Sequence, residues 1–225
     1  MILRRLTFTT ALLAGMALAP AAAVEPFNAD YSATYMGMSA NAQMSIAAAG
    51  NNRWTYSMRV NNRMGSVSQS TTFDVVDGKL RPLSGTDTSQ VLIRRRSTNS
   101  TYDWNAGQAR WSGDVKANRS GPIALRSGDL DALLMNLAIA RDVPAGRNLS
   151  YRMVENGRAR QMNWQSHGRE AVTVGGKSHQ ATRVSQTDGD KQMVLWVVEG
   201  IPVPVRILQK RDGKDEIDLR MTALR

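Results

Sequence analysis

The stretch Trp54-Thr55-Tyr56-Ser57-Met58-Arg59-Val60-Asn61 alternates between apolar and polar side chains. A β-strand places successive side chains on opposite faces, so a period of two predicts a strand with one buried face and one face in water. The same alternation occurs at residues 40–46, 203–207 and 217–221. The sequence therefore predicts several strands that are covered on one face only.

Short turn sequences separate these segments at the spacing of hairpins, which favours an antiparallel meander. They are Gly50-Asn51-Asn52, Asp77-Gly78, Asn105-Ala106-Gly107, Asn156-Gly157, Gly175-Gly176, Asp188-Gly189 and Asp212-Gly213. The continuous apolar run at residues 193–198 fits a strand that is covered on both faces. Pro202 and Pro204 favour an edge strand or a bulge after it, because neither residue has a backbone N–H to donate.

One segment, residues 127–141, has a helical period instead. Its apolar residues recur at intervals of three and four: Leu130, Leu133, Leu134, Leu137 and Ala138. Ser127 or Asp129 is available as the N-cap, and Pro144-Ala145-Gly146 ends the helix. A single helix is too small to cover a flat sheet of many strands. We therefore predict a mainly β fold: an open, strongly curved antiparallel β-barrel or half-barrel wrapped around one amphipathic helix.

Composition excludes several kinds of chemistry. The 225 residues contain no Cys and two His, which excludes disulfides, thiolate zinc sites and Cys nucleophiles. We predict His167, beside Gly168, in a turn and His179 in the strand after Gly175-Gly176. Neither has a metal-ligand spacing, so we interpret them as surface or strand-face residues. Asp129 and Asp131 stand at the start of the predicted helix, where carboxylates interact favourably with the helix dipole, so we interpret them as capping residues and not as a catalytic pair. We therefore predict a non-enzymatic protein with no catalytic residue, no metal and no cofactor.

The first 23 residues are typical of a secretory signal peptide. Arg4 and Arg5 precede an apolar run at residues 6–18, and small residues follow up to Ala23. The apolar run is too short to span a bilayer comfortably, which makes an N-terminal membrane anchor the weaker alternative. We predict cleavage near Ala23 and Val24, a single β-rich periplasmic domain over residues 24–225, no lipid attachment and no later transmembrane span.

The formal net charge is +10, and about +8 remains after removal of Arg4 and Arg5. For an exported protein the accessible polyanions are lipid phosphates and envelope polymers, so we expect no nucleic-acid partner. The densest basic cluster is Arg94-Arg95-Arg96, directly after Val91-Leu92-Ile93. It is either a charged strand end that discourages edge pairing, or a site at which these arginines bind an anionic head group.

Methionine is unusually frequent, with 12 in the chain. Simple core filling is the plainest explanation, and a deformable lining for an amphipathic ligand is the functional one. Met36-Gly37-Met38 would offer two thioethers to copper(I), without further ligands nearby. For a ligand held between helix and sheet, we predict an apolar cleft formed by Trp54, Tyr56, Met58, Leu133, Leu137 and Trp196.

Four segments of the chain carry a resemblance to a known family: Asp77-Gly78-Lys79-Leu80-Arg81-Pro82-Leu83, Tyr102-Asp103-Trp104-Asn105, Gly128-Asp129-Leu130-Asp131-Ala132-Leu133-Leu134, and Leu195-Trp196 with residues 201–207. They resemble a proteobacterial family of exported proteins catalogued as domain of unknown function three-one-zero-eight. The resemblance implies a β-rich periplasmic fold and supplies no established catalytic residue. The architecture is also analogous to periplasmic lipoprotein carriers, whose open barrels wrap a helix and hold acyl chains.

Two functions follow as hypotheses. The first is a periplasmic protein that binds an amphipathic, lipid-like ligand or supports maintenance of the envelope. The second is an interaction scaffold that binds a protein or an anionic envelope polymer and holds no small ligand.

Overall fold

The computed structural model describes residues 24–35 and 37–225. The predicted signal peptide and Met36 of the copper hypothesis lie outside the described residues. The first half of the chain forms strands β1 (Phe27–Tyr35), β2 (Met38–Gly50), β3 (Arg53–Asn62), β4 (Gly65–Val76), β5 (Lys79–Val91), β6 (Arg94–Asp103), β7 (Gln108–Gly113) and β8 (Ile123–Ala124), with a 3-10 helix at Ala117–Arg119. The second half forms α1 (Ala132–Asp142), β9 (Ser150–Glu155), β10 (Arg158–Asn163), β11 (Gln165–Val174), β12 (Lys177–Asp188), β13 (Lys191–Val198), β14 (Arg206–Arg211) and β15 (Lys214–Leu224).

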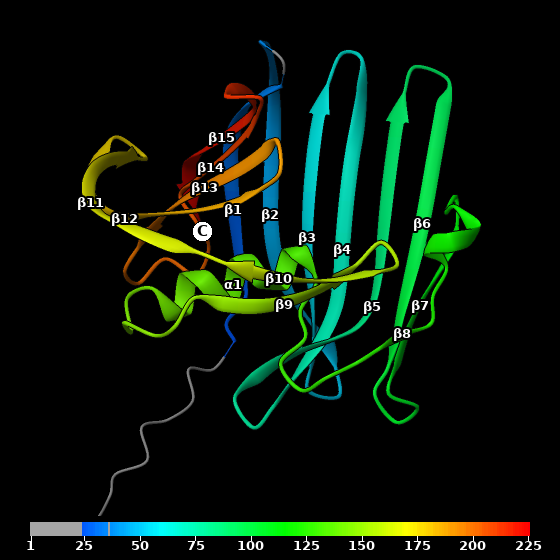
Figure 1. Cartoon of the computed structure of the whole chain (residues 1–225). Coiled ribbons are helices and arrows are strands. Elements are labelled where there is room, and N and C mark those ends of the chain that lie inside the picture. Colours follow the sequence, from blue (N-terminus) through cyan, green and yellow to red (C-terminus); the bar gives the residue numbers. More distant parts are fainter. Residues whose placement is uncertain (1–23, 36) are drawn as a thin grey trace, which may run out of the picture.

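Thirteen of these strands form one sheet in the order β11-β12-β13-β14-β15-β1-β2-β3-β4-β5-β6-β7-β8. All of its pairings are antiparallel, and β1 pairs with β15, so the two halves of the chain meet in the middle of the sheet. The sheet is strongly curved and open, with β11 and β8 as its edges (Figure 1). Helix α1 and the separate β9-β10 hairpin lie across one face of the long strands (Figure 1). The predicted fold class is confirmed.

The predicted strand faces are also confirmed. Tyr56 on β3 and Met44 on β2 are fully buried, whereas Arg59 and Gln43 on the same strands are exposed. Strand β13 is buried on both faces from residue 194 to residue 198, as its continuous apolar run predicts. Helix α1 contacts β3, β4 and β5 on one side and β13 on the other, so the core lies inside the curve of the sheet.

The helix begins later than predicted, and neither Ser127 nor Asp129 is its N-cap. The N-cap is Asp131, whose side chain accepts a hydrogen bond from the backbone N–H of Leu134. Leu130 is the reason, because its backbone bonds to strand β9: its N–H donates to the carbonyl of Arg152, and its own carbonyl accepts from Val154. A residue committed to a neighbouring strand in this way cannot also belong to the first turn of a helix.

Two other local predictions are wrong. The strand predicted at residues 203–207 begins only at Arg206, and residues 203–205 are not part of it, because Pro202 and Pro204 cannot donate to a ladder. Val203 and Val205 are nevertheless buried. His167 lies in strand β11, at a β-bulge, and not in a turn; its Nε2 is 2.7 Å from the hydroxyl of Ser185.

A cavity at the start of strand β5 as the candidate functional site

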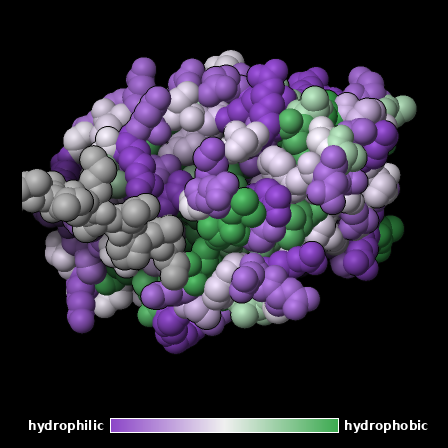
Figure 2. All heavy atoms as spheres, turned by 90° about the horizontal axis from the view of Figure 1, so that it is seen from below, coloured by the Kyte–Doolittle hydropathy of each residue, from purple (hydrophilic) through white to green (hydrophobic). Residues whose placement is uncertain are grey.

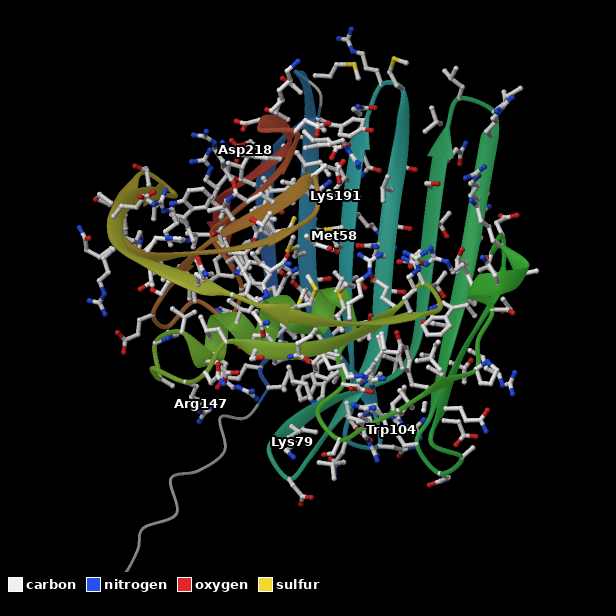
Figure 3. The ribbon with its side chains drawn as sticks, viewed as in Figure 1. Met58, Lys79, Trp104, Arg147, Lys191 and Asp218 are labelled. Atoms are coloured by element: carbon white, nitrogen blue, oxygen red, sulfur yellow. The ribbon has the colours of Figure 1, made fainter. Side chains whose placement is uncertain are left out.

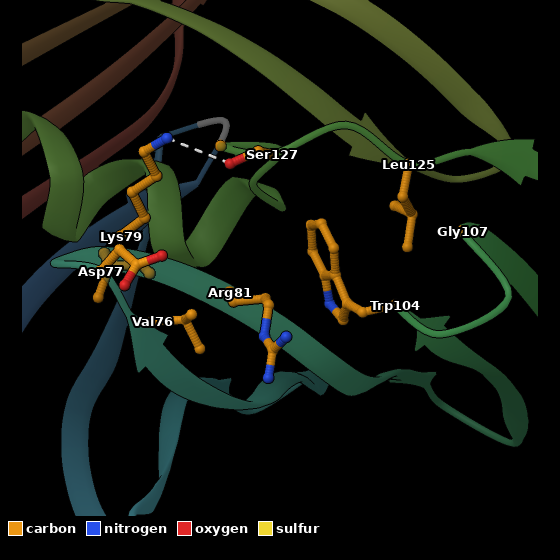
Figure 4. A pocket seen from close by; sticks show the side chains of 10 residues that line it. Val76, Asp77, Lys79, Arg81, Trp104, Gly107, Leu125 and Ser127 are labelled. Carbon is orange, nitrogen blue, oxygen red and sulfur yellow. Dashed lines mark hydrogen bonds between the residues drawn. The ribbon is translucent and has the colours of Figure 1, made fainter.

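A cavity of about 370 Å³ lies at the lower end of the sheet, where β5 begins. Figure 4 shows side chains from three parts of the chain around it. The lining residues are Val76, Asp77, Lys79, Leu80 and Arg81 from the β4-β5 hairpin, Trp104 and Gly107 from the β6-β7 hairpin, and Leu125, Ser127 and Gly128 from the segment before the helix. This volume falls within the range of small-molecule sites in proteins, roughly 300 to 1,000 Å³.

The β4-β5 hairpin can bring its side chains to the cavity because its turn is tight. Asp77 and Gly78 have φ angles of 52° and 71°, the left-handed conformation that a two-residue hairpin turn requires. Asp and Gly tolerate that conformation better than other residues do. The turn places Lys79 at the first position of β5, beside the segment that leads into the helix (Figure 3).

Trp104 forms an ordered aromatic wall. Its indole N–H donates to the backbone carbonyl of Pro82 at 2.6 Å. The guanidinium of Arg81 lies 5.7 Å from the centre of the Trp104 ring, within the range of a cation–π contact. Two hydrogen bonds, of 2.8 and 2.6 Å, join Arg81 to the carboxylate of Asp74, and they raise the pKa of the guanidinium. Arg81 is therefore held in place and neutralised by Asp74.

Lys79 is in a different position. Its ammonium donates to the hydroxyl of Ser127 at 3.1 Å (Figure 4), and within the described residues it has no carboxylate partner. A hydroxyl group carries no charge that would neutralise the ammonium, and Asp77, which also lines the cavity, forms no ion pair with it. The cavity thus joins one available cation to a wall that includes Trp104, Leu80 and Leu125. Seen from below, hydrophobic atoms are exposed in the middle of this end of the molecule and hydrophilic side chains frame them (Figure 2).

A second cluster lies deeper, between the sheet and the helix. Asp87, Asp131 and Glu155 share a polar pocket with the hydroxyl of Thr71. Burial raises the pKa of Asp131 to about 6, and burial with repulsion from Asp131 and Asp87 raises the pKa of Glu155 to about 8. The open volume is about 10 Å³, room for no more than one water molecule. This cluster therefore affects stability and cannot hold a ligand of any size.

The residues predicted to form an apolar cleft lie in or against the core and do not line the cavity. Tyr56, Leu133, Leu137 and Trp196 are buried, and Trp54 and Met58 are partly buried against them. Leu133 alone among them borders the small polar pocket. Trp196 lies under the guanidinium of Arg206, 4.4 Å from its ring centre, and its indole N–H donates to Glu170. Ligand binding by these six residues stays a prediction.

Arg94, Arg95 and Arg96 lie far from the cavity. Lys79 and Val91 are the first and last residues of β5, and Arg94 pairs with Val91. Val91 follows Lys79 by twelve residues, and this corresponds to about 40 Å along an extended strand. All three arginines are exposed. Their role as a head-group site stays a prediction, and the structure separates them from the cavity that could hold the rest of a small ligand.

The sequence did contain a signal for the cavity. Three of the four segments that carry the family resemblance, residues 77–83, 102–105 and 128–134, each supply lining residues. They are distant in sequence, and only their meeting point identifies the site. Lys79 and Trp104 were not predicted as site residues because each segment alone contains no motif for a particular chemistry.

Within the described residues, no helix is long and apolar enough to cross a membrane, and no group of three or more His, Cys, Asp or Glu residues is arranged to hold a metal ion.

Comparison with solved structures finds a similar fold. The crystal structure of a β-barrel-like protein of domain of unknown function DUF1849 from Brucella abortus matches with a TM-score of 0.56 and 10% identity, over 89% of this chain and 97% of that one. The complex of Pseudomonas aeruginosa MucA and MucB matches with a TM-score of 0.36, 12% identity and coverages of 89% and 51%. A crystal structure of MucB matches with a TM-score of 0.34 and 10% identity, over 89% of this chain and 52% of that one. The chain therefore spans about half the length of the chains in these last two structures.

None of the curated proteins matches the sequence. The profile of the family described as "Protein of unknown function (DUF3108)" matches residues 30–220, which is most of the chain. The protein described above is therefore a member of the DUF3108 family.

Proposed function

We propose that this chain is a non-enzymatic periplasmic protein that binds a small amphipathic anion in the cavity at the start of β5. The observation that carries the proposal is the ammonium of Lys79, which among the described residues has a hydroxyl partner and no ion pair, and which lines the same cavity as the ring of Trp104. An anionic group would pair with Lys79, and the apolar part of the same ligand would cover Trp104, Leu80 and Leu125.

The size of the cavity limits the ligand class. A volume of about 370 Å³ is near the lower end of the usual range, roughly 300 to 1,000 Å³, so the ligand buries a short chain or a ring and not a whole phospholipid. Each buried methylene contributes about 0.8 kcal/mol before the costs of association are subtracted. A few methylenes together with one ion pair therefore favour modest affinity.

The non-enzymatic part of the proposal is supported by the kind of groups around the cavity. They are a lysine, an arginine that is already paired, an aspartate and a serine. Ser127 and Lys79 are in contact, but the lysine is the donor to the hydroxyl, so it is not placed as the base that would activate a serine nucleophile. The periplasmic part is supported by the order of charged, apolar and small residues at positions 1–23. N-terminal sequencing of the protein from a periplasmic extract tests it, and a retained Met1 in a cytoplasmic fraction would contradict it.

Binding is tested by thermal unfolding with decanoate, an aromatic carboxylate and uncharged decanol. Decanoate at one hundred times its dissociation constant should stabilise the protein by about 2.7 kcal/mol. Lys79→Gln should weaken the binding of decanoate more than the binding of decanol, because only decanoate has the negative charge that Lys79 binds. Lys177→Gln, an exposed lysine on β12, is the matched control and should change neither.

The alternative is the scaffold hypothesis, in which the chain binds a protein or an anionic polymer and no small ligand. If none of the three probes shifts the unfolding temperature, and protein recovered gently from the periplasm has no added mass, the ligand proposal is wrong and the scaffold hypothesis replaces it.

A further inference from the structure

Three hairpins end together at the upper end of the sheet, opposite the cavity (Figure 1). These are the β1-β2, β3-β4 and β5-β6 hairpins, and large apolar side chains are exposed at all three tips. Ile93 is 98% exposed, Leu92 68% and Met64 48%. Val91, Met38 and Tyr35 are also exposed. We call residues 35, 38, 63, 64 and 91–96 the hairpin-tip surface.

Two of the tips are joined by their backbones. The N–H of Leu92 donates to the carbonyl of Met64 at 3.0 Å, which fixes the β5-β6 tip against the β3-β4 tip. Gly65 permits this approach, because a side chain at that position would collide with the backbone carbonyl of Gln90. The side chain of Asn62 accepts hydrogen bonds from the N–H groups of Met64 and Gly65, which orders the β3-β4 turn. The apolar residues of these two tips therefore form one surface, and the β1-β2 tip lies at the same end of the sheet (Figure 1).

The residues of the β5-β6 turn are not those that folding favours. Three other two-residue turns of this chain place Asp or Asn before Gly: Asp77-Gly78, Asn156-Gly157 and Asp212-Gly213. The β5-β6 turn has Leu92 and Ile93 instead, and Leu92 has a φ of 52°. A left-handed conformation is unfavourable for Leu, and exposing Leu and Ile to water gains nothing for the folded state. An external apolar partner would account for both costs.

The charges beside this turn indicate what kind of partner it is. Arg63, Arg94, Arg95 and Arg96 are exposed, and none of them forms an ion pair within residues 24–35 and 37–225. Elsewhere many arginines are paired, among them Arg81, Arg206 and Arg211. The nearby carboxylate of Asp114 accepts from the backbone N–H of Ser97, so it does not offset the cluster by pairing with it.

We propose that the hairpin-tip surface docks on an anionic phospholipid bilayer, with Leu92, Ile93 and Met64 inserted between head groups and the four arginines bound to phosphates. Apolar side chains at a tip, with cations set behind them, fit the boundary between acyl chains and head groups. Arginine binds phosphate oxygens through two N–H groups at once. An anionic polymer would pair with the arginines, but it offers no apolar phase to Ile93. The observations therefore favour the bilayer.

Docking is tested by sedimentation with vesicles of one part phosphatidylglycerol to three parts phosphatidylethanolamine, and with vesicles of phosphatidylcholine. Protein should bind the first and not the second, and binding should weaken as salt is added. Replacing Arg94, Arg95 and Arg96 together by Gln should weaken binding at least tenfold. The control replaces Arg53, Arg110 and Arg169 by Gln, which removes the same charge from exposed positions outside the surface and should change binding less than twofold.

A second variant combines Leu92→Asn and Ile93→Gly, which gives the turn its usual residues and should preserve the fold. It should also weaken binding at least tenfold. All variants are purified from periplasmic extracts in the same way, so their N-terminal segment is the same in every comparison. If the arginine variant loses binding and the turn variant does not, the partner is a polyanion and the bilayer proposal is wrong.

The depth of insertion is measured by a fluorescent label, which is simple because the chain has no Cys. A polarity-sensitive dye on Ile93→Cys should shift to the blue with anionic vesicles. The same dye on Asn105→Cys, in the turn between β6 and β7, should not shift. Equal responses at the two positions would overturn the proposal. The outcome is independent of the cavity, which is tested with soluble ligands in the absence of vesicles.

Discussion

The hydroxyl of Thr71 on strand β4 donates a 2.5 Å hydrogen bond to the carboxylate of Asp131, the residue that caps helix α1. The same carboxylate accepts from the backbone N–H of Leu134 at 2.9 Å. One side chain therefore ends the turn before the helix and attaches the helix to the sheet. Both Thr71 and Asp131 are buried, so the loss of either bond leaves the carboxylate out of contact with bulk water.

Thr71→Val should destabilise the protein by about 1 to 3 kcal/mol, because it leaves a buried carboxylate with one fewer donor. Thr72→Val is the matched control. Its hydroxyl faces the other side of the sheet, 3.5 Å from the hydroxyl of Thr55, and its loss should change the free energy of unfolding by about 0.5 kcal/mol or less. Urea unfolding of both variants measures the difference, and equal midpoints would show that the Thr71 bond does not stabilise the fold.

The buried carboxyl groups predict lower stability at alkaline pH. The pKa of Glu155 is about 8 in the folded protein against 4.5 for a free side chain, and the pKa of Asp131 is about 6 against 3.8. At a pH between the unfolded-state pKa and the folded-state pKa of either group, the folded state binds more protons than the unfolded state. The free energy of unfolding therefore falls as pH rises through this range. We expect a decrease of several kcal/mol between pH 5 and pH 8.5, because a shift of one pKa unit corresponds to about 1.4 kcal/mol.

Glu155→Gln should remove most of that decrease, because glutamine does not titrate. Glu199→Gln, at an exposed position after β13, should leave it unchanged. Unfolding curves of the three proteins at several pH values measure the effect. A free energy of unfolding that rises between pH 5 and pH 8.5 would mean that Glu155 is ionised in the folded state throughout this range.

Leu137→Asp places a charge in the core beneath the curved sheet, where Leu137 is buried. The cost should be several kcal/mol, enough to unfold a domain whose total stability is typically about 5 to 15 kcal/mol. Thr55→Asp, on the outer face of β3, should cost about 0.5 to 1 kcal/mol. Circular dichroism and denaturant titration compare the stability of the two variants. Equal stability would contradict the placement of Leu137 on the side of the helix that faces the core.

The ion pair of Arg152 and Asp129 is largely buried, whereas the pair of Arg160 and Asp188 is exposed, so we expect their loss to cost different amounts of stability. Asp129 is 1% exposed and its carboxylate lies 2.5 Å from Arg152. Arg152→Met leaves that carboxylate unpaired and should cost about 3 to 5 kcal/mol. Arg160 pairs with Asp188 at 2.6 Å, but both side chains are well exposed, 43% and 51%. Arg160→Met should cost less than about 1 kcal/mol. Similar unfolding midpoints for the two variants would contradict the distinction.

Local sequence was enough to predict several of the strands, most of the turns and the open curved sheet. Alternation at positions such as Tyr56 and Met58 depends only on the two-residue repeat of a strand, and a turn such as Asp77-Gly78 depends only on backbone conformation at two residues. Each of these signals involves residues that are only a few positions apart along the chain. The amphipathic helix was predictable for the same reason, although its first residue was not, because Leu130 bonds to a strand that comes later in the sequence.

The candidate site was decided by tertiary structure. Lys79, Trp104 and Ser127 belong to three segments, and their convergence depends on the register of β5 and β6 and on the path of the chain before the helix. Sequence alone treats Lys79 and Arg94 as similar exposed cations. The length of β5 places them at opposite ends of the sheet, one beside a cavity and the other behind an apolar turn. The distances between side chains of different segments are set by packing and pairing across the whole sheet, which no local repeat encodes.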